Sequence, residues 1–272
     1  MDFVILAAIF LLAGFLAIWY YREVPTKEEL KRRLPNKVSL PSVFLALVIG
    51  VVVWYLISTS GGIPGPSRIF MTLFALLLFE SFFLFAMRWL QSNFLSILAG
   101  LVGSGVIFGS YLLFPSFWLL GVIVILVTFG AATLLIRMDY LRTKVLCAIA
   151  ILWTAYDIIL TEFVLPTFTV PVQTTRPNFL FPSVSVGNIS LGSGDFMFLV
   201  LFTLILFRDF GKVSAMILVV AQTVGLIITG YFLTSDEFLI PFLAIMTPIF
   251  FVVYIISLRQ KERVRSGENA PE

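Results

Sequence analysis

Residues 94–136 read FLSILAGLVGSGVIFGSYLLFPSFWLLGVIVILVTFGAATLLI and contain no charged side chain. Only the short sequence Phe114-Pro115-Ser116 interrupts this apolar run. A helix needs about 20 apolar residues to cross a bilayer, so the stretch predicts two membrane-spanning helices joined by a tight turn. Its first half contains Gly100, Gly103, Gly105 and Gly109, and small residues of this kind let membrane helices pack closely.

The rest of the chain has the same character. It is 60% hydrophobic and 12% charged, with a mean hydropathy of +1.07, whereas a soluble domain carries about 25% charged residues. We therefore expect an all-α polytopic membrane protein with nine transmembrane helices. The predicted spans are roughly Phe3–Tyr20, Leu40–Ile57, Ile69–Met87, Phe94–Leu113, Phe117–Ile136, Val145–Leu165, Ser190–Phe207, Val213–Phe232 and Leu239–Leu258.

Two connections are longer than a turn. The charged segment Arg22–Asn36 predicts a short interfacial helix, and the segment after residue 165 is rich in Pro, Thr, Ser and Val, which favours extended chain. We expect one membrane-embedded domain over residues 1–258, with spans 1–6 in about 3–165, an extended outer loop at 166–189 and spans 7–9 in about 190–258. A polar cytoplasmic tail, expected to fray, follows at 259–272.

The basic residues fix the expected orientation. If the nine spans alternate, sixteen of the 18 lysines and arginines fall on one side, and only Arg68 and Arg176 fall on the other. Loops rich in Lys and Arg stay in the cytoplasm. The N-terminus is therefore predicted outside and the C-terminus inside, as in a multi-pass protein of the cell membrane.

Several kinds of site are excluded by composition. The chain has no histidine, which rules out histidine-based zinc sites and Ser-His or Cys-His nucleophiles. Its one cysteine, Cys147, cannot form an internal disulfide, and no glycine-rich phosphate loop of the GxxxxGK[ST] kind is present. We expect no metal, no cofactor and no nucleic-acid partner.

Four acids fall within or at the edge of the predicted spans: Glu80, Asp157, Glu162 and Asp195. Ionisable groups inside a membrane are costly and mark functional sites by default. At 1.5 Å per helical residue, Asp157 lies roughly 18 Å above the inner end of the sixth span, about 12 Å from the outer face. Asp195 lies roughly 8 Å below the outer end of the seventh span by the same rise. The two carboxyl groups are therefore predicted at similar depth.

A pair of carboxyl groups in a medium of low dielectric constant tends to share one proton. Aspartic proteases use this arrangement, in which the ionised group takes a proton from water and the protonated group polarises the peptide carbonyl. Leu191-Gly192-Ser193-Gly194-Asp195 begins the seventh span, and its glycines allow a second backbone to approach and permit strained dihedral angles.

Three motifs resemble those of the presenilin and signal peptide peptidase family of intramembrane aspartyl proteases. Tyr156-Asp157 matches the Tyr-Asp pair of that family's sixth span, and Gly192-Ser193-Gly194-Asp195 matches its Gly-x-Gly-Asp motif in the seventh. Pro241-Phe242-Leu243 stands where the family carries Pro-Ala-Leu, and it departs from that pattern at the middle residue.

The resemblance implies that Asp157 and Asp195 are catalytic, that Tyr156 supports the site, and that the Pro241–Leu243 segment shapes the cleft. It implies hydrolysis of transmembrane segments or remnant signal peptides within the lipid bilayer. The predicted orientation matches signal peptide peptidases, and presenilins are inverted, so we expect substrates with the N-terminus inside. Small size and short loops are typical of a prokaryotic, archaeal member, and a homo-oligomer stays possible.

Alternatives stay open at this stage. A proton-coupled transporter or channel would use Glu80, Asp157 and Asp195 as a relay; a structural role for Glu80 is the other interpretation. Prepilin-type peptidases also use two aspartates, although at the cytoplasmic face. The stretch Val184-Ser185-Val186 can be a strand that pairs with substrate or a plain loop. Thr154 either lines a polar path to Asp157 or bonds its own helix backbone.

Overall fold

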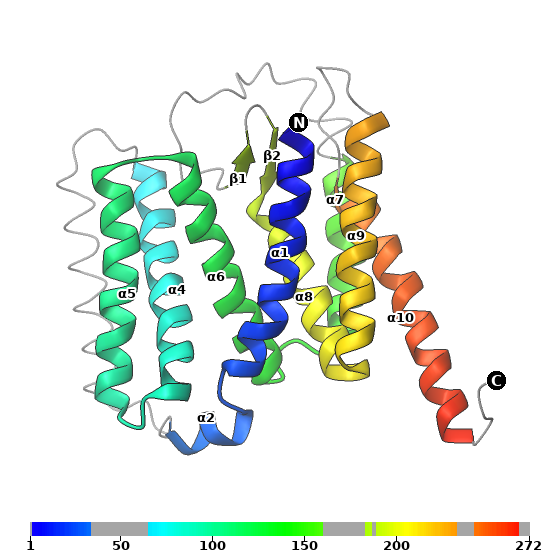
Figure 1. Cartoon of the computed structure of the whole chain (residues 1–272), viewed down its shortest axis with the longest axis horizontal. Helices are drawn as coiled ribbons and strands as arrows, with labels where there is room; N and C mark the ends of the chain where they lie inside the picture. The colour runs from blue at the N-terminus through cyan, green and yellow to red at the C-terminus, as the bar shows by residue number, and fades with distance from the viewer. Residues whose placement is uncertain (1, 34–64, 160–182, 187–188, 233–241, 267–272) are drawn as a thin grey trace.

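The computed structural model describes residues 2–33, 65–159, 183–186, 189–232 and 242–266. The second predicted span, Leu40–Ile57, lies outside these residues. Long helices run side by side, and one small hairpin stands at the end of the bundle where the chain begins (Figure 1). The elements are α1 (Asp2–Glu23), α2 (Lys27–Arg33), α4 (Gly65–Trp89), α5 (Asn93–Leu113), α6 (Phe117–Arg137), α7 (Thr143–Ile159), β1 (Ser183–Val186), β2 (Ile189–Gly192), α8 (Ser193–Phe210), α9 (Lys212–Phe232) and α10 (Leu243–Ser266).

Six of the described helices are long and apolar enough to cross a membrane: α1, α4, α5, α6, α9 and α10. The two aspartates lie on the shorter helices α7 and α8, whose described lengths are 17 and 18 residues. The first turn of α1 and the last turn of α10 stand at opposite ends of the bundle (Figure 1), as an odd number of spans requires. The prediction of an all-α polytopic membrane protein is confirmed, with the hairpin as an addition.

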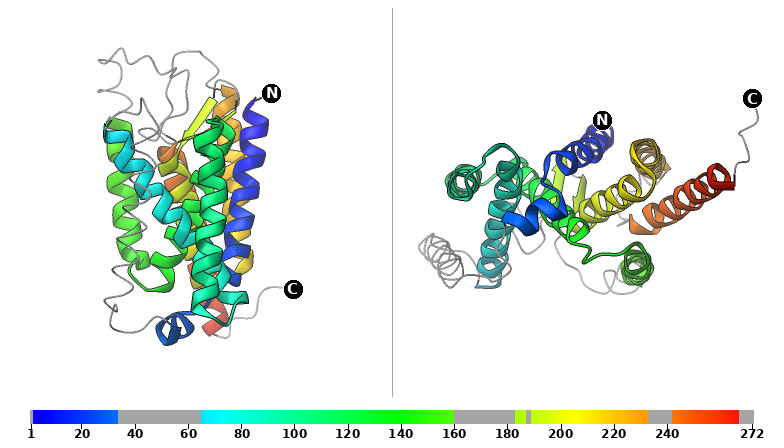
Figure 2. Two further views of the ribbon diagram at one scale, coloured as in Figure 1. Left: turned by 90° about the vertical axis from the view of Figure 1, so that its left-hand side faces the viewer. Right: turned by 90° about the horizontal axis from the view of Figure 1, so that it is seen from below.

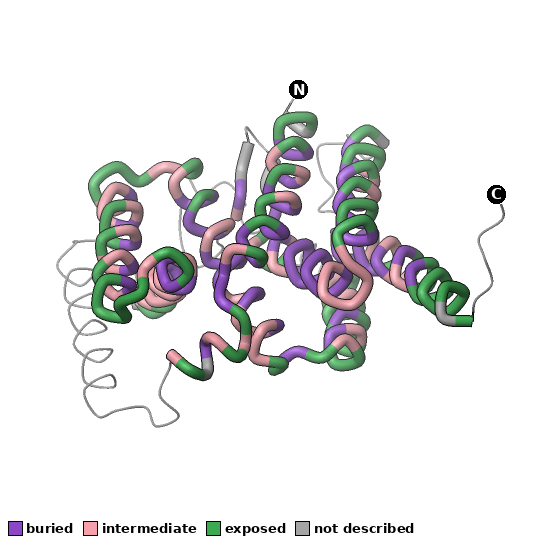
Figure 3. Tube along the Cα trace, turned by 60° about the horizontal axis from the view of Figure 1, so that its bottom comes forward, coloured by how far each residue is buried: buried purple, intermediate pink, exposed green. Residues whose placement is uncertain are grey.

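Helix α8 forms the centre of the bundle. It packs against α1, α6, α9 and α10, and every residue from Phe198 to Leu206 is buried. A helix that is apolar on all sides is stable only where neighbours surround it. Figure 3 shows the converse for the outer helices, where buried residues in purple alternate with exposed residues in green that face away from the bundle.

Close helix contacts at small residues join α4 to α5 and α6. A Cβ atom at Gly130 would lie 2.0 Å from Ser81 Oγ and 2.9 Å from Ser81 Cα. That serine donates a 2.8 Å hydrogen bond to the Leu126 carbonyl of α6. Gly100 and Gly103 face phenylalanine rings of α4, as predicted, whereas Gly105 and Gly109 meet open space in the described structure. The prediction of close contact is therefore right for two of the four glycines.

Several boundaries differ from those expected. The seventh span does not begin at Ser190, because residues 189–192 form β2 and the helix starts at Ser193. Strand β1 lies within the loop predicted as extended, and it pairs antiparallel with β2, with Val184 opposite Leu191. Helix α10 continues to Ser266, so residues 259–266 are helical rather than frayed. The short helix predicted within Arg22–Asn36 is confirmed as α2, and its interfacial position stays a prediction.

A polar network joins the helix ends near α2, on the predicted cytoplasmic side. Thr143 Oγ1, at the start of α7, donates to Asp209 Oδ2 at 2.7 Å and accepts from Arg208 Nη2 at 2.9 Å. Lys27 of α2 bonds Asp139 in the turn after α6, and Arg208 lies 4.0 Å from the same carboxylate. The Lys27 ammonium holds the pKa of Asp139 below its usual value. These contacts tie the bases of α7 and α8 together.

Candidate active site

Asp195 lies in the first turn of α8, directly after β2. The chain leaves the strand at Gly192, whose backbone is extended with φ −64° and ψ 155°. The Gly192 N–H then donates a 3.0 Å hydrogen bond to Asp195 Oδ2. A carboxylate at the third helical position commonly makes this bond, and the positive end of the helix dipole favours its negative charge. The strand-to-helix junction therefore fixes the Asp195 carboxyl group.

The glycines before Asp195 differ from expectation in one respect. Among the described residues, only Gly211 is a glycine with positive φ, so neither Gly192 nor Gly194 needs a strained dihedral angle. Both are exposed. Within the part of the chain that the structure describes, a Cβ atom at Gly194 would meet nothing within 4 Å, and one at Gly192 would make only ordinary contact with Asp195. These glycines leave the backbone beside Asp195 uncovered.

Asp157 lies on α7, at the edge of the bundle. Seen from below (Figure 2), α7 stands at the periphery, and its main packing partner among the described elements is α10. The Asp157 side chain is half-buried. Its Oδ2 atom is buried without a hydrogen-bond partner in the described structure, and the backbone N–H of Leu243 lies against the carboxyl group. Asp157 thus faces the start of α10.

The two carboxyl groups are close enough for the charge of Asp157 to act on Asp195. The rings of Trp153 on α7 and Phe198 on α8 lie 6.3 Å apart on the same two helices. Counting residues along two predicted spans placed both acids at similar depth, and the helices do bring them together.

The start of α10 joins both aspartate helices. Phe242 and Leu243 are buried, and Pro241 lies outside the described residues. The Phe10 ring of α1 contacts Phe242 at 5.5 Å and Phe196 at 5.7 Å, both edge to face. Phe196 directly follows Asp195. A single buried ring therefore connects the Phe-Leu segment to the first turn of α8, and its position on the first span gave no sign of this role.

Other predicted residues lie elsewhere. The Tyr156 side chain is 55% exposed, and its ring centroid lies 5.8 Å from that of Trp153; its support of the site stays a prediction. Ser193 begins α8 and is half-buried. Glu162 lies outside the described residues. Glu80 lies on α4, across the bundle from α7 (Figure 1), and its Oε1 atom is buried without a partner in the described structure.

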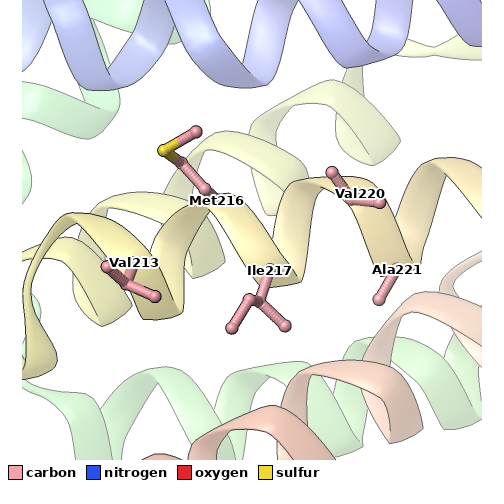
Figure 4. Close-up of a pocket in the computed structure, with 5 residues that line it drawn as sticks. All are labelled: Val213, Met216, Ile217, Val220 and Ala221. Atoms are coloured by element: carbon pink, nitrogen blue, oxygen red, sulfur yellow. The ribbon is translucent and has the colours of Figure 1, made fainter.

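A groove of about 520 Å³ lies away from the aspartates. It follows one face of α9 and is lined by Val213, Met216, Ile217, Val220 and Ala221 (Figure 4). These side chains are all apolar, and they lie near the start of α9, at the opposite end of the bundle from the hairpin. A lipid-facing surface has this character. Within the described residues, no three His, Cys, Asp or Glu side chains gather to hold a metal ion.

No protein-family model matches the sequence, and no curated protein matches it either. Among solved structures, the chain is similar to a presenilin family intramembrane aspartate protease in space group C222, with a TM-score of 0.63. The alignment covers 96% of this chain and 100% of that one, at 14% sequence identity. At this identity the likeness concerns the fold. The predicted presenilin-like fold is therefore confirmed over nearly the whole chain.

Proposed function

We propose that this chain is an intramembrane aspartyl protease and that Asp157 and Asp195 are its catalytic pair. The observation that carries the proposal is that these two acids lie on neighbouring helices, α7 and α8, whose Trp153 and Phe198 rings are 6.3 Å apart, so that the charge of Asp157 reaches Asp195. The likeness in fold to an intramembrane aspartate protease supports the same reading.

The proposed chemistry needs only the two carboxyl groups and water. The ionised carboxylate accepts a proton from a water molecule, and the water oxygen attacks the carbonyl carbon of the scissile peptide bond. The protonated carboxyl group donates to the developing oxyanion. The C–N bond then breaks as the amide nitrogen takes up a proton. Backbone donors already face both acids, from Gly192 to Asp195 and from Leu243 to Asp157.

A transmembrane substrate must unwind before its peptide bonds can react. The β1–β2 hairpin ends at Gly192, three residues before Asp195, and a two-stranded hairpin can accept a further strand at an edge. The exposed backbone at Gly192 and Gly194 leaves room for an extended segment beside the acid. We propose that substrate binds there as an added strand.

Proline scanning of the substrate tests this binding mode. Proline cannot donate a ladder hydrogen bond, so strand addition predicts that single prolines block cleavage at alternate positions near the scissile bond. If substrate only needs a loosened helix, prolines should promote cleavage with no alternation. The second pattern would reject the added strand.

Substrate orientation follows from enzyme orientation. A chiral site docks an extended segment with one polarity, and the 16-to-2 distribution of basic residues predicts an N-out enzyme. We propose a preference for segments whose N-terminus is inside. The same segment presented in both orientations should be cut faster as the N-in form, and equal rates would reject the preference.

The decisive experiment for the function uses purified protein in bilayers and a single-span N-in reporter. Asp157→Asn and Asp195→Asn should each abolish cleavage while leaving the fold intact, because each removes one ionisable group with little change in shape. Glu80→Gln is the matched control, since it neutralises a buried acid on a helix across the bundle. The assignment fails if wild type does not cleave, or if either aspartate variant cleaves like wild type.

The same control discriminates the transporter alternative. A relay through Glu80, Asp157 and Asp195 requires the three acids to be linked, whereas α4 packs mainly against α5 and α6 and α7 packs mainly against α10. Transport would be favoured by two results together: the wild-type protein does not cleave the reporter, and it conducts protons in liposomes in a way that Glu80→Gln abolishes.

A further inference from the structure

Polar contacts from two neighbouring helices hold the first turn of α10. Thr154 of α7 and Thr247 of α10 share a hydrogen bond of 2.8 Å between their hydroxyl oxygens, and Thr154 Oγ1 also lies 3.5 Å from the Leu243 carbonyl. On the other side, Gln222 Nε2 of α9 donates to the Met246 carbonyl at 3.3 Å. The turn from Leu243 to Thr247 is thus attached to both α7 and α9.

These polar groups are buried in an apolar bundle. Gln222 is 0% exposed and Thr247 is 5% exposed. Gln222 Oε1 has no hydrogen-bond partner in the described structure. A buried amide or hydroxyl group costs stability unless it is hydrogen-bonded. Gln222 makes one hydrogen bond to α10 and leaves its buried amide oxygen unpaired in the described structure, which costs free energy of folding that a leucine would not cost. This residue type therefore indicates a role other than stability.

The held turn lies directly against the proposed catalytic acid. Thr154 precedes Asp157 by three residues, so the two share one face of α7, and the Leu243 N–H lies against the Asp157 carboxyl group. Pro248 follows Thr247 immediately. Proline has no N–H and cannot complete the helical bond to the carbonyl four residues earlier. The first turn therefore lacks the helical hydrogen bond to the Ala244 carbonyl, and the contacts from its sides add to the bonds that remain.

We propose that Gln222, Thr247 and Thr154 are positioning residues, which set the location of Asp157 relative to Asp195 through the first turn of α10. Gln222 fixes the turn against α9, and the threonine pair transmits its position to α7. The effect on catalysis rests on the proposed function, whereas the effect on the separation of Asp157 and Asp195 rests on the contacts alone.

Kinetics test the catalytic consequence. Gln222→Leu and Thr247→Val should each lower kcat about tenfold and leave KM within about twofold, because a small misplacement of a catalytic group slows the chemical step. Thr247→Ser keeps the hydroxyl group and should restore most of the rate. Thr154→Val combined with Thr247→Val should cost no more than Thr154→Val alone, since the Thr154 variant already removes the bond that Thr247 shares. Thr223→Val is the matched control, because among the described residues that buried hydroxyl donates to the Val219 carbonyl of its own helix and to no other helix.

Cross-linking tests the geometry without any cleavage. In a Cys147→Ser background, Asp157→Cys and Asp195→Cys provide a unique thiol pair, and bis-thiosulfonate reagents of graded length report their separation. Adding Gln222→Leu or Thr247→Val should change the preferred reagent length, and adding Thr223→Val should not. An unchanged pattern in all backgrounds overturns the inference even if wild type is a protease. A changed pattern with an uncleaved reporter keeps the positioning and rejects the protease.

Discussion

Replacing Phe10 by alanine should weaken the packing between the start of α8, which carries Asp195, and the start of α10, which carries Leu243. The ring is fully buried and contacts Phe196 and Phe242 edge to face. Lipid tails are as apolar as the protein interior, so the loss of a hydrophobic transfer term contributes little. The cavity does contribute: removing a ring empties on the order of 100 Å³, which at about 24 cal/mol per Å³ costs about 2.4 kcal/mol. Two aromatic contacts add about 0.5–1.5 kcal/mol each, giving about 3–5 kcal/mol in all.

Equilibrium unfolding in bicelles measures this change in the free energy of unfolding. Leu12→Ala is the matched control, because Leu12 lies on the same helix and is 57% exposed to lipid; it should cost less than about 0.5 kcal/mol, as surface substitutions do. Reporter cleavage should also fall in Phe10→Ala at temperatures where the protein stays folded. Equal stabilities for the two variants would refute the argument that Phe10 links α1, α8 and α10.

Two further predictions concern packing and charge. Gly130→Ala should destabilise the protein by about 1–3 kcal/mol through overpacking, because its Cβ would overlap Ser81. Gly105→Ala, whose Cβ meets no atom of the described residues within 4 Å, should be neutral in the same thermal unfolding series. Lys27 lowers the pKa of Asp139, so their contact stabilises the fold above the unfolded-state pKa of about 4 and is lost as pH falls through the lower folded value. Asp139 has a left-handed backbone with φ 58°, which asparagine also tolerates. Asp139→Asn should therefore reduce the dependence of the melting temperature on pH between roughly pH 5 and 2; a pH profile identical to that of wild type would contradict the pairing.

Sequence reasoning predicted the spans well because lipid imposes a simple length rule. Any apolar run near 20 residues has to satisfy its backbone hydrogen bonds internally, so it becomes a helix. The same rule missed the true start of α8. Residues 189–192 are apolar enough to extend the predicted span, yet they pair with β1 outside the helix. Each residue of β2 pairs with a residue of β1 that lies 3–9 positions earlier in the chain. The hydropathy of a segment carries no information on whether such a pairing partner exists.

The aspartates were identifiable because charge in lipid is rare and costly, so two carboxyl groups at matched depth stood out without any knowledge of packing. The residues around them were not. Phe10 is one of 29 phenylalanines, and only the fold shows that it contacts both Phe196 and Phe242. Gln222 carried a signal that could have been used: an amide ten residues into an apolar helix is costly for the same reason as a carboxyl group.

The way α7 is attached follows from the weakness of apolar association in membranes. Because lipid competes equally for apolar surface, helix positions there depend on close packing and on interhelical hydrogen bonds. The described part of α7 has little close packing: Leu152 and Trp153 are at least half exposed, and α10 is its main neighbour. Among the described residues, its polar attachments lie at two places: Thr143 bonds Asp209 and Arg208 at the base, and Thr154 bonds Thr247 and the Leu243 carbonyl near the acid. A helix attached at two polar points can change its tilt at the outer end while its base stays fixed, so the separation of the aspartates is governed by the bond that lies nearest to them.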